Sequence, residues 1–422
     1  MNFTRRDLLA LGALPALPAF TGCASTTPPA SDRPLGWAAV GQTTGGAGAR
    51  PEHVFDVRDR AGLDAALKLG DTPKIIRVHT LIDLGPGGVE SFRDPAFSFD
   101  AFDRAYDPAT WGRADPTGPL EEARERSAKR QAAAIVVRVP SNTTLIGAAP
   151  GAGFQHGTLL LGKVENVIVR DLDLSDAYDH FPAWEPRDNG HGEWNSEYDP
   201  LSITGARRVW VDHCSLSDGN RPDHLEPVRL GRRVQHHDGL LDITHGGDLI
   251  TISWCRFSSH DKTMLIGGDE KHTEDIGKLR VTLHHNHFHG CKERTPRVRY
   301  GRVHVACNLF SADRAEDFGY SLGVGYQSQI VSDFNHWQLP AGVAPDQLIR
   351  RLKGSALTDR GSRLNGRPVD LVAAWNAARP TDTLAADVGW RPADVYETRG
   401  LQPADPDRLA EQIRAGVGPR RV

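Results

Sequence analysis

Charged residues that could bind a cation and an acidic polymer recur at matching points of an internal repeat. The acidic members come first along the chain, and the basic members follow. They are Asp199, Asp238 and Asp242, then Lys262, and then Arg294, Arg297 and Arg299. Calcium is a hard cation that prefers several oxygen ligands, and carboxylates supply them. If the copies of the repeat stack, the sequence predicts a cation site beside a row of basic side chains.

The repeat consists of short segments that are rich in β-branched residues and alternate with period two. Five copies align on their last apolar residue, which is Leu174, Leu216, Phe257, Phe288 and Phe310. The shortest step, from Phe288 to Phe310, is 22 residues, and the longer steps carry insertions rich in Gly, Asp and Pro. A fixed strand pattern with variable loops predicts an all-β fold, a parallel β-helix solenoid. A sandwich would not need matched polar positions in five copies, and a TIM barrel would need helices between the strands.

A second strand precedes the later copies and brings the charged residues to one surface. These strands are Leu201–Thr204, Leu241–Thr244 and residues 297–299. Alternation turns Ile203, Ile243 and Val298 inward, so Ser202, Asp242, Arg297 and Arg299 point outward. Residues forty or more apart in the chain would then become neighbours on one exposed sheet face.

The N-terminal residues predict export. Arg5-Arg6 precedes an apolar run that is too short and too interrupted by proline to span a membrane, so residues 1–23 are interpreted as a Tat-type signal. Cys23 follows Phe20-Thr21-Gly22 as in a lipobox, and it is either lipidated or lost with an ordinary signal. Either way the protein would be secreted, periplasmic or held at a cell surface.

The remaining chain divides by composition. Residues 24–36 read as a linker, residues 37–340 as the β-helix domain, and residues 341–422 as a tail that packs on the coil. Helical spacing at residues 62–69 predicts a short N-terminal cap, and residues 346–352 and 407–413 look helical within the tail. The net charge of −4 gives no global signal for nucleic-acid binding, so any attraction to a polyanion must be local.

Other residues that could do chemistry are better explained by packing. Cys214 and Cys255 share one repeat position and should stack inside the coil, whereas Cys291 and Cys307 could pair or remain free. The four histidines of HHNHFHG form no known metal motif, so we favour a structural role over metal binding for His284, His285, His287 and His289. Asp212 and His213 lie in the repeat strand and are interpreted as structural. Trp184 and Trp194 either stack on sugar rings or anchor a long loop.

The chain resembles the pectate lyases of polysaccharide lyase family 1. The motifs that carry the resemblance are VWVDHCSLSDG, HDGLLDITHGGDLITISW, SSHDKTMLIGG and RTPRVRYGRVHV, and the match runs from about residue 43 to about residue 337. The resemblance implies a right-handed parallel β-helix, calcium as cofactor, and eliminative cleavage of polygalacturonate to unsaturated oligogalacturonides.

The resemblance also implies a role for each matching residue. Asp199, Asp238 and Asp242 match the primary calcium ligands of the family. Lys262 and Arg299 match the residues that bind the substrate carboxylate, and Arg294 matches the catalytic base. Asp188, in EPRDNG, matches a ligand of additional calcium ions that are held together with substrate.

An arginine base is chemically demanding because a free guanidinium stays protonated at ordinary pH. A nearby calcium ion together with Lys262 and Arg299 should lower the pKa of Arg294 by like-charge repulsion. We therefore expect an alkaline activity optimum. Calcium and Lys262 would also neutralise the uronate carboxylate and stabilise the charge that develops when the C5 proton leaves.

Three other functions are compatible with a β-helix. A pectin lyase acts on methyl-esterified chains without calcium, and retention of all three aspartates argues against it. A polygalacturonase would hydrolyse with paired carboxylic acids and would not need Lys262 or Arg294. A non-catalytic polysaccharide-binding protein would tolerate the loss of either base. Nothing in the sequence requires an oligomer, so a monomer is expected.

Overall fold

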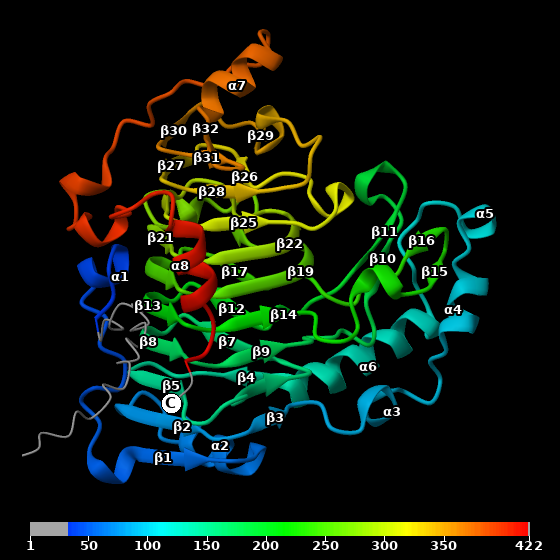
Figure 1. Ribbon diagram of the computed structural model, residues 1–422. Coiled ribbons are helices and arrows are strands. Elements are labelled where there is room, and N and C mark those ends of the chain that lie inside the picture. Colours follow the sequence, from blue (N-terminus) through cyan, green and yellow to red (C-terminus); the bar gives the residue numbers. More distant parts are fainter. Residues whose placement is uncertain (1–32, 421–422) are drawn as a thin grey trace, which may run out of the picture. The chain divides into compact units, whose positions relative to one another are not determined.

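Three parallel sheets wind around a common core in the computed structural model, which describes residues 33–420 (Figure 1). Successive turns of the coil add strands to the three sheets, and neighbouring strands pair in parallel apart from the last two strands of one sheet, which pair antiparallel. This arrangement is a right-handed parallel β-helix, so the predicted fold class is confirmed. The described residues belong to one compact unit.

The strands are grouped here as sheet 1, sheet 2 and sheet 3. Sheet 1 contains β1 (Val54–Val57), β2 (Lys74–Val78), β5 (Thr143–Gly147), β8 (Glu165–Arg170), β13 (Arg207–Asp212), β18 (Asp248–Ser253), β21 (Val281–His284), β24 (Arg302–Ala306), β27 (Gln329–Asp333) and β30 (Leu357–Arg360). Sheet 2 contains β4 (Val136–Arg138), β7 (Thr158–Gly162), β12 (Leu201–Thr204), β17 (Leu241–Thr244), β20 (Leu265–Ile266), β23 (Arg297–Val298), β26 (Leu322–Val324) and β29 (Ile349–Arg351). Sheet 3 contains β3 (Leu81–Asp83), β6 (Gly153–Gln155), β9 (Asp173–Ser175), β14 (Ser215–Ser217), β19 (Arg256–Lys262), β22 (His287–Glu293), β25 (Leu309–Ser311), β28 (His336–Gln338), β31 (Arg363–Leu364) and β32 (Arg367–Pro368).

The register of sheets 1 and 3 is the one that the sequence repeat predicts. In sheet 1, Val167 pairs with Val209, and the ladder continues through Ile250, Val281 and Val303. In sheet 3, the five aligned residues stack in the order Leu174, Leu216, Phe257, Phe288 and Phe310. The second strands predicted before the later copies are β12, β17 and β23 of sheet 2. Because a slip of one residue would turn every apolar side chain outward, the buried core fixes this register.

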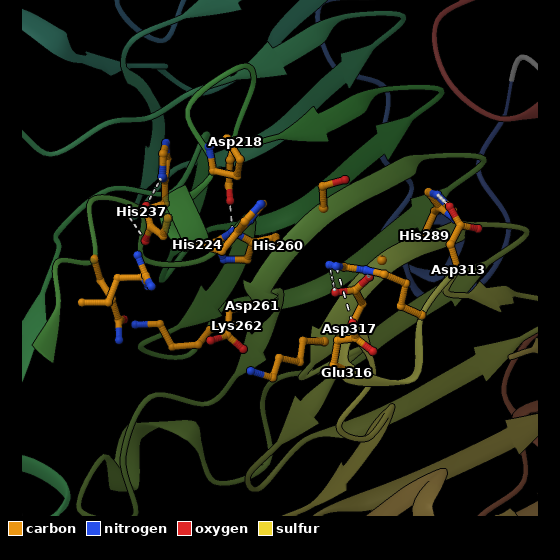
Figure 2. Close-up of a pocket in the computed structure, with 18 of the residues that line it drawn as sticks. Asp218, His224, His237, His260, Asp261, Lys262, His289, Asp313, Glu316 and Asp317 are labelled. Atoms are coloured by element: carbon orange, nitrogen blue, oxygen red, sulfur yellow. Dashed lines mark hydrogen bonds and ion pairs between the residues drawn. The ribbon is translucent and has the colours of Figure 1, made fainter. Parts of the chain in front are cut away.

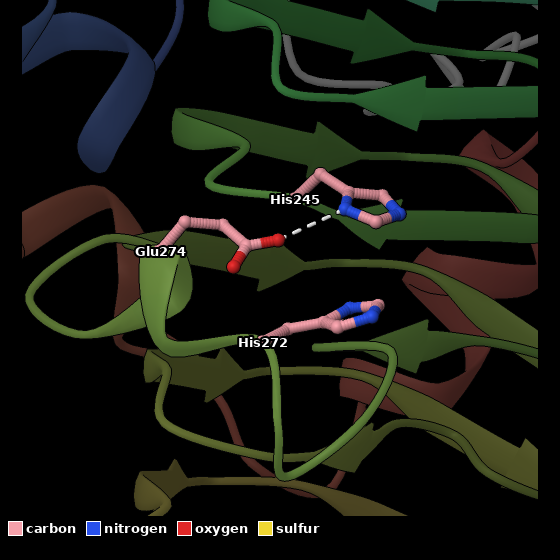
Figure 3. A group of neighbouring side chains, drawn as sticks. All are labelled: His245, His272 and Glu274. Atoms are coloured by element: carbon pink, nitrogen blue, oxygen red, sulfur yellow. Dashed lines mark hydrogen bonds and ion pairs between the residues drawn. The ribbon is translucent and has the colours of Figure 1, made fainter.

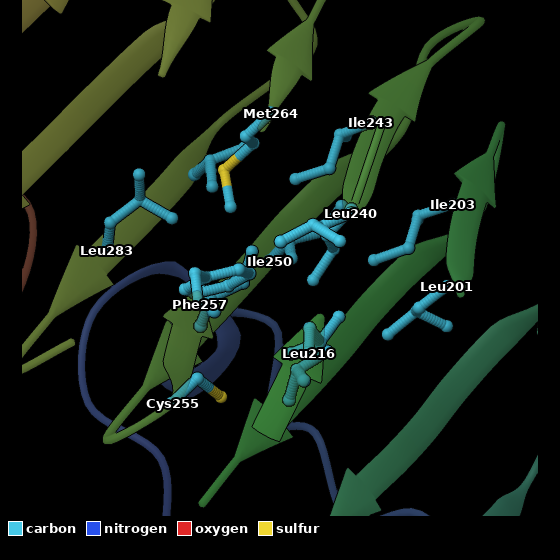
Figure 4. Close-up of a cluster of buried hydrophobic side chains, with 14 of the residues drawn as sticks. Leu201, Ile203, Leu216, Leu240, Ile243, Ile250, Cys255, Phe257, Met264 and Leu283 are labelled. Atoms are coloured by element: carbon cyan, nitrogen blue, oxygen red, sulfur yellow. The ribbon is translucent and has the colours of Figure 1, made fainter. Parts of the chain in front are cut away.

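Like side chains stack on like along the interior of the coil. The rings of Phe257, Phe288, Phe310 and Trp337 are stacked with successive centroid distances of 4.7, 5.1 and 4.8 Å. Aliphatic side chains such as Ile203, Ile243 and Ile250 fill the space between the sheets (Figure 4). Buried apolar surface of this kind is the main source of stability in such a fold.

A ladder of polar side chains lines the turn between sheets 1 and 3. Asn286, Asn308 and Asn335 are fully buried, and each donates its Nδ2 to a backbone carbonyl of the neighbouring turn. Their Oδ1 atoms also accept from the side-chain or backbone amides of the turn before. Cys214 and Cys255 hold the same position in earlier turns, as the repeat predicted, and the Cys214 amide donates to Cys255 Sγ.

Short helices cover both ends of the coil. The N-terminal cap predicted at residues 62–69 is α2 (Arg60–Leu67), which buries Leu63 and Ala66 in the main core beside β1 and β2. At the other end, α7 (Leu371–Ala378) buries Trp375 in the same core beside β30. Capping removes the exposed apolar core and unpaired strand edges that a solenoid end would otherwise present.

The coil continues beyond residue 340, where the sequence repeat ends. β29, β30 and β31 add one more strand to each sheet, although residues 346–352 were expected to be helical. Only a 3-10 turn at Pro345–Gln347 forms there, because pairing with β26 outweighs the local helical spacing. The helix expected near residues 407–413 is present as α8 (Leu409–Gly416), which packs on the outside of the coil against Cys307 and Leu309.

Residues before the expected domain boundary at residue 37 already contact the coil. Leu35, in the segment expected to be a linker, accepts a hydrogen bond from Thr251 of β18 through its carbonyl oxygen. It leads into α1 (Trp37–Val40), which packs on sheet 1. The signal and Cys23 lie outside the described residues. No helix within residues 33–420 is both long and apolar enough to cross a membrane.

A helical insertion flanks the coil and was not predicted. It contains α3 (Gly88–Phe92), α4 (Phe99–Ala105), α5 (Pro108–Trp111) and α6 (Pro119–Ile135). Two antiparallel hairpins lie near it in Figure 1, namely β10 (Ala183–Glu185) with β11 (Glu193–Asn195) and β15 (Val228–Arg229) with β16 (Arg232–Arg233). These segments share a second hydrophobic cluster that includes Phe102, Ile135, Trp184 and Trp194.

Candidate active site

Three carboxylates meet near the N-terminal ends of two neighbouring strands of sheet 2. Asp199 lies just before β12, Asp238 lies in the loop before β17, and Asp242 lies within β17. One oxygen of each carboxylate can be chosen so that all three lie within 4.8 Å of one another. Parallel stacking of β12 on β17 is what brings these residues together across forty positions of sequence.

Gly239 allows the carboxylates to approach so closely. A Cβ at this position would lie 2.8 Å from Asp199 Oδ1 and 2.9 Å from Asp242 Oδ1. Its backbone amide donates to Asp199 Oδ1 at 2.8 Å, and the amide of Leu265 donates to Asp242 Oδ1 at the same distance. The backbone therefore orients two of the three carboxylates before any ion binds.

Burial and mutual repulsion make this acidic group costly to ionise. Burial raises the pKa of Asp242 to about 7, and the Asp238 charge adds to the shift. The pKa of Asp199 is raised well above its ordinary value by burial and by the charges of Asp242 and Asp238. A cation would restore the ionised forms, since opposite charge favours them.

Basic side chains lie on the turns next to the acidic group. Lys262, at the end of β19, donates its Nζ to Asp238 Oδ1 at 3.1 Å. Arg294 follows β22, and its positive charge lowers the pKa of Asp242 against the effect of burial. Arg299 follows β23 and donates Nη1 to the carbonyl oxygens of Gly267 and Gly268 at 2.9 and 2.7 Å. The structure thus brings the predicted acids and bases together on adjacent turns.

The arginines form a dense positive group. Burial lowers the pKa of Arg299, and repulsion from Arg297 and Arg294 lowers it further. Burial also lowers the pKa of Arg297, whose Nε is buried without a hydrogen-bond partner among the described residues. Arg294 has a φ of 60°, a conformation that it shares with other non-glycine residues at turns of the coil, such as Trp254 and His285.

Sequence reasoning missed an acid within this basic group. Glu293 accepts from Arg294 Nε at 3.2 Å, and Arg350 Nη1 lies 3.8 Å from its other oxygen. Glu293 is also the β-ladder partner of Lys262. Its position directly before Arg294 in the chain was the signal that could have identified it.

Asp188 is not part of the acidic group. It begins a 3-10 turn at Asp188–Gly190 in the loop between β10 and β11, and its Oδ1 accepts from the Asn189 amide at 2.7 Å. Within the part of the chain that the structure describes, the close carboxylate group at sheet 2 contains only Asp199, Asp238 and Asp242.

A groove of about 540 Å³ opens beside Lys262 (Figure 2). Its walls come from β19, β22 and the loops around residues 218–237 and 313–317. Acidic lining residues such as Asp218, Asp261 and Asp317 are interspersed with basic ones such as Lys262 and Lys292. The groove therefore presents both signs of charge beside Lys262.

The other sequence candidates have structural partners. Trp184 and Trp194 are buried ladder partners in β10 and β11, so they anchor the loop and are closed to a sugar ring. Cys291 and Cys307 are both free, and Cys307 Sγ contacts the carbonyl of Leu401. Asp212 accepts hydrogen bonds from Ser253 Oγ and pairs with His213 Nδ1, as a structural role requires.

The four histidines also show ordinary packing. His284 and His285 face each other through their Nδ1 atoms at 3.0 Å, while His287 and His289 both contact Ser311 Oγ. Burial lowers the pKa of His285 to about 4 and that of His287 to about 3. None of the four belongs to a potential metal-binding group within the described chain.

A parallel β-helix that carries a carboxylate cluster beside lysine and arginine side chains has the features of a protein that binds an acidic polymer. The model of a family described as pectate lyase matches residues 118–385. A pectate lyase of Bacillus subtilis (strain 168) is 39% identical over 370 residues, which cover 85% of this chain and 86% of the relative. Pectate lyase D of Dickeya chrysanthemi is 36% identical over 342 residues, 78% of each chain.

Solved structures agree with this result. The thermostable pectate lyase PL 47 has a TM-score of 0.86 and 39% identity, and the match covers 92% of this chain and 97% of that one. A pectate lyase bound to a hexasaccharide has a TM-score of 0.85 and 37% identity, with 91% and 96% covered. The chain belongs to the pectate lyase family and is a polysaccharide lyase.

Proposed function

We propose that this lyase cleaves de-esterified α-1,4-polygalacturonate by calcium-dependent β-elimination and releases 4,5-unsaturated oligogalacturonides. The observation that carries the proposal is the group of Asp199, Asp238 and Asp242, whose oxygens lie within 4.8 Å of one another beside Lys262. A cation bound by this group would favour the ionised forms of Asp199 and Asp242 and would reduce the repulsion between the group and an acidic substrate.

Calcium fits the donor set of this site. The three aspartates offer only oxygen atoms, and calcium accepts six to eight oxygen ligands, so positions would remain for water and substrate carboxylates. The raised pKa values of Asp199 and Asp242 indicate that their charges are not compensated by the protein alone. When bound, the ion supplies positive charge that neutralises a uronate carboxylate and so makes the adjacent C5 proton more acidic.

The basic residues would carry out the elimination. Arg294 removes the C5 proton, the electrons of that bond form the C4–C5 double bond, and the C4–O bond breaks with the leaving oxygen protonated by water. Lys262 and Arg299 bind the substrate carboxylate and stabilise the negative charge that develops on it. The lowered pKa values of Arg297 and Arg299 support a strongly positive setting, which is the condition that an arginine base requires.

Asp188 is proposed to hold a further calcium ion only when substrate is present. The support for this role is the match of EPRDNG to the family pattern, and Asp188 itself lies in the loop between β10 and β11. Replacement Asp188→Ala should leave calcium binding to the free enzyme unchanged and weaken binding of oligogalacturonide. Equal oligogalacturonide affinity in the variant and the parent would contradict this role.

Two alternatives predict other products. A pectin lyase would act on methyl-esterified chains without calcium and would have no use for a group of three close aspartates. A non-catalytic binding protein would release nothing. The solved pectate lyase with a bound hexasaccharide supports an oligosaccharide chain as the ligand class for this fold.

The decisive assay follows the ultraviolet absorbance of the unsaturated product. Purified protein is incubated at alkaline pH with polygalacturonate or with highly methyl-esterified pectin, in the presence of calcium and after chelation. We expect a signal on polygalacturonate that disappears with chelator and returns with calcium. A signal on pectin that persists in chelator would favour pectin lyase, and reducing sugars without absorbance would indicate hydrolysis.

Export and a monomeric state complete the proposal. Arg5-Arg6 and Cys23 support a Tat-type signal with a lipid anchor on the cysteine. Mass spectrometry of the protein from its native membrane fraction should find an acylated N-terminal cysteine, and Cys23→Ala should release the protein in soluble form. Sedimentation of the soluble form should give the mass of one chain.

A further inference from the structure

A second group of potential metal ligands lies beyond the C-terminal ends of the sheet 2 strands, whereas the aspartates lie near the N-terminal ends. His245 is in the turn after β17, and His272 and Glu274 are in the loop between β20 and β21, one turn further along the coil (Figure 3). One ligand atom from each of the three residues lies within 4.8 Å of the others. None of these residues takes part in the proposed elimination.

The group is already organised. His245 Nδ1 and Glu274 Oε1 are 3.0 Å apart, and the two imidazole rings lie 4.5 Å apart. Asp275 ties the loop to the turn, because its Oδ1 accepts from the Gly246 amide at 2.6 Å. The His245 and Glu274 side chains are 45% and 50% exposed, so an ion can enter from solvent.

The Nδ1 atom of His272 has an unused capacity to bind a ligand. It is closed off from solvent and has no hydrogen-bond partner within the described residues. A Cβ on Gly268 would lie 3.2 Å from this nitrogen, so the glycine leaves room for the ring. A buried polar atom without a partner is costly, so a ligand bound at this nitrogen would be stabilising.

We propose that His245, His272 and Glu274 bind a divalent transition ion of the zinc or nickel type. Imidazole nitrogen and carboxylate oxygen suit such ions, whereas calcium prefers an all-oxygen site. Bonds of about 2.1 Å place ligand atoms roughly 3.4 Å apart in a tetrahedron, which the 4.8 Å group can reach with small side-chain movements. The ion would take the place of the direct contact between His245 Nδ1 and Glu274 Oε1.

Binding at this position would act on the proposed active site through Arg299. The loop that carries His272 and Glu274 begins at Gly267 and Gly268, whose carbonyl oxygens accept from Arg299 Nη1. The same loop accepts a hydrogen bond from the Tyr300 hydroxyl at the Glu270 carbonyl. An ion that joins this loop to the preceding turn would therefore restrain the position of Arg299.

The test measures metal binding directly. Tag-free full-length protein is saturated with calcium to fill the aspartate group, and nickel is then titrated by calorimetry. We expect one nickel ion per chain, with an affinity at least about tenfold weaker in His272→Ala and in Glu274→Gln. Cobalt bound in place of nickel should show the visible absorption of a nitrogen-ligated ion, and His245→Ala should remove it.

Control variants show whether a loss of nickel affinity is specific to this site. His191→Ala removes another exposed histidine that contacts a carboxylate, Glu193 at 2.8 Å, but that has no second imidazole beside it. It should leave nickel affinity unchanged, as should Asp242→Asn, which alters only the aspartate group. Nickel affinity that is unchanged in both His272→Ala and Glu274→Gln, or no binding to the parent protein, would overturn the proposal.

Discussion

Asp199 and Asp242 show how position changes the chemistry of an ordinary side chain. Each accepts a hydrogen bond from a backbone amide. Burial and the negative charge of neighbouring aspartates disfavour the ionised form of each carboxylate. An isolated aspartate titrates near 3.9, so the raised pKa of about 7 for Asp242 means that the folded protein holds protons that the unfolded chain releases. A cation bound at this site, as proposed, would replace those protons.

The first prediction concerns stability as a function of pH. Between the ordinary aspartate pKa and about 7, the metal-free folded state binds more protons than the unfolded state, so its stability should fall as pH rises. Calcium should restore stability, and more strongly at the upper end of that window. Denaturant unfolding of chelated protein across this range measures the slope.

Asp242→Asn is the control for this effect. Asparagine keeps the shape and the acceptor for the Leu265 amide but cannot lose a proton. The variant should show a shallower decline with pH and a smaller gain with calcium. A slope equal to that of the parent protein would mean that other groups control the pH dependence.

A second prediction at this scale concerns Arg299. Its Nη1 is held by two carbonyl oxygens, a geometry that a lysine ammonium cannot reproduce at the same place. Arg299→Lys should therefore raise KM for polygalacturonate by about tenfold, the effect of losing about 1.4 kcal/mol of binding, with a smaller change in kcat. Arg302→Lys, at an exposed arginine that contacts Gln329, is the matched control and should leave both constants unchanged. A KM equal to that of the parent would remove Arg299 from substrate binding.

At the scale of elements, the repeat made most of the coil predictable. Five copies placed the strands of sheets 1 and 3 in the observed register, because stacked turns require like residues at like positions. The last turn was missed, since β29, β30 and β31 lack the repeat pattern and are defined by pairing with the turn before. The helical insertion was also missed, although Pro119 at the start of α6 and Glu121 and Glu122 in its first turn are typical start signals.

The asparagine ladder gives a prediction about these turns. Asn308 Oδ1 accepts from both the backbone amide and Nδ2 of Asn286, and all of these atoms are buried. Asn308→Ala removes the acceptor of both donors, although Asn286 Nδ2 keeps its bond to the Ile252 carbonyl, and it should lower the free energy of unfolding by about 1–3 kcal/mol for each N–H left unsatisfied. Denaturant unfolding measures the loss.

Cys214→Ala tests the equivalent repeat position in an earlier turn, where the side chain makes no strong hydrogen bonds. Thiols are weak donors and acceptors, so this change removes packing and little else. Its cost should be smaller than that of Asn308→Ala. A larger cost for the cysteine variant would show that packing, rather than hydrogen bonding, dominates the turn.

For the whole molecule, the sequence indicated an acidic group followed by bases, and the fold explains why they meet. Strand stacking makes neighbours of residues that are far apart in the chain. The order of the motifs along the sequence therefore becomes their order along successive turns of the coil. Contacts that depend on rotamers and loops could not be predicted in this way. Examples are the pairing of Glu293 with Arg294, the isolation of Asp188 and the closeness of His245 to His272.

The most direct test of the central claim compares Arg294→Ala with the parent enzyme at saturating polygalacturonate and calcium. If Arg294 is the base beside a calcium-binding aspartate group, kcat should fall by about 10²–10⁴, while the calcium affinity of the free protein stays the same. A fall of less than about tenfold, with the variant folded and calcium still bound, would contradict the account.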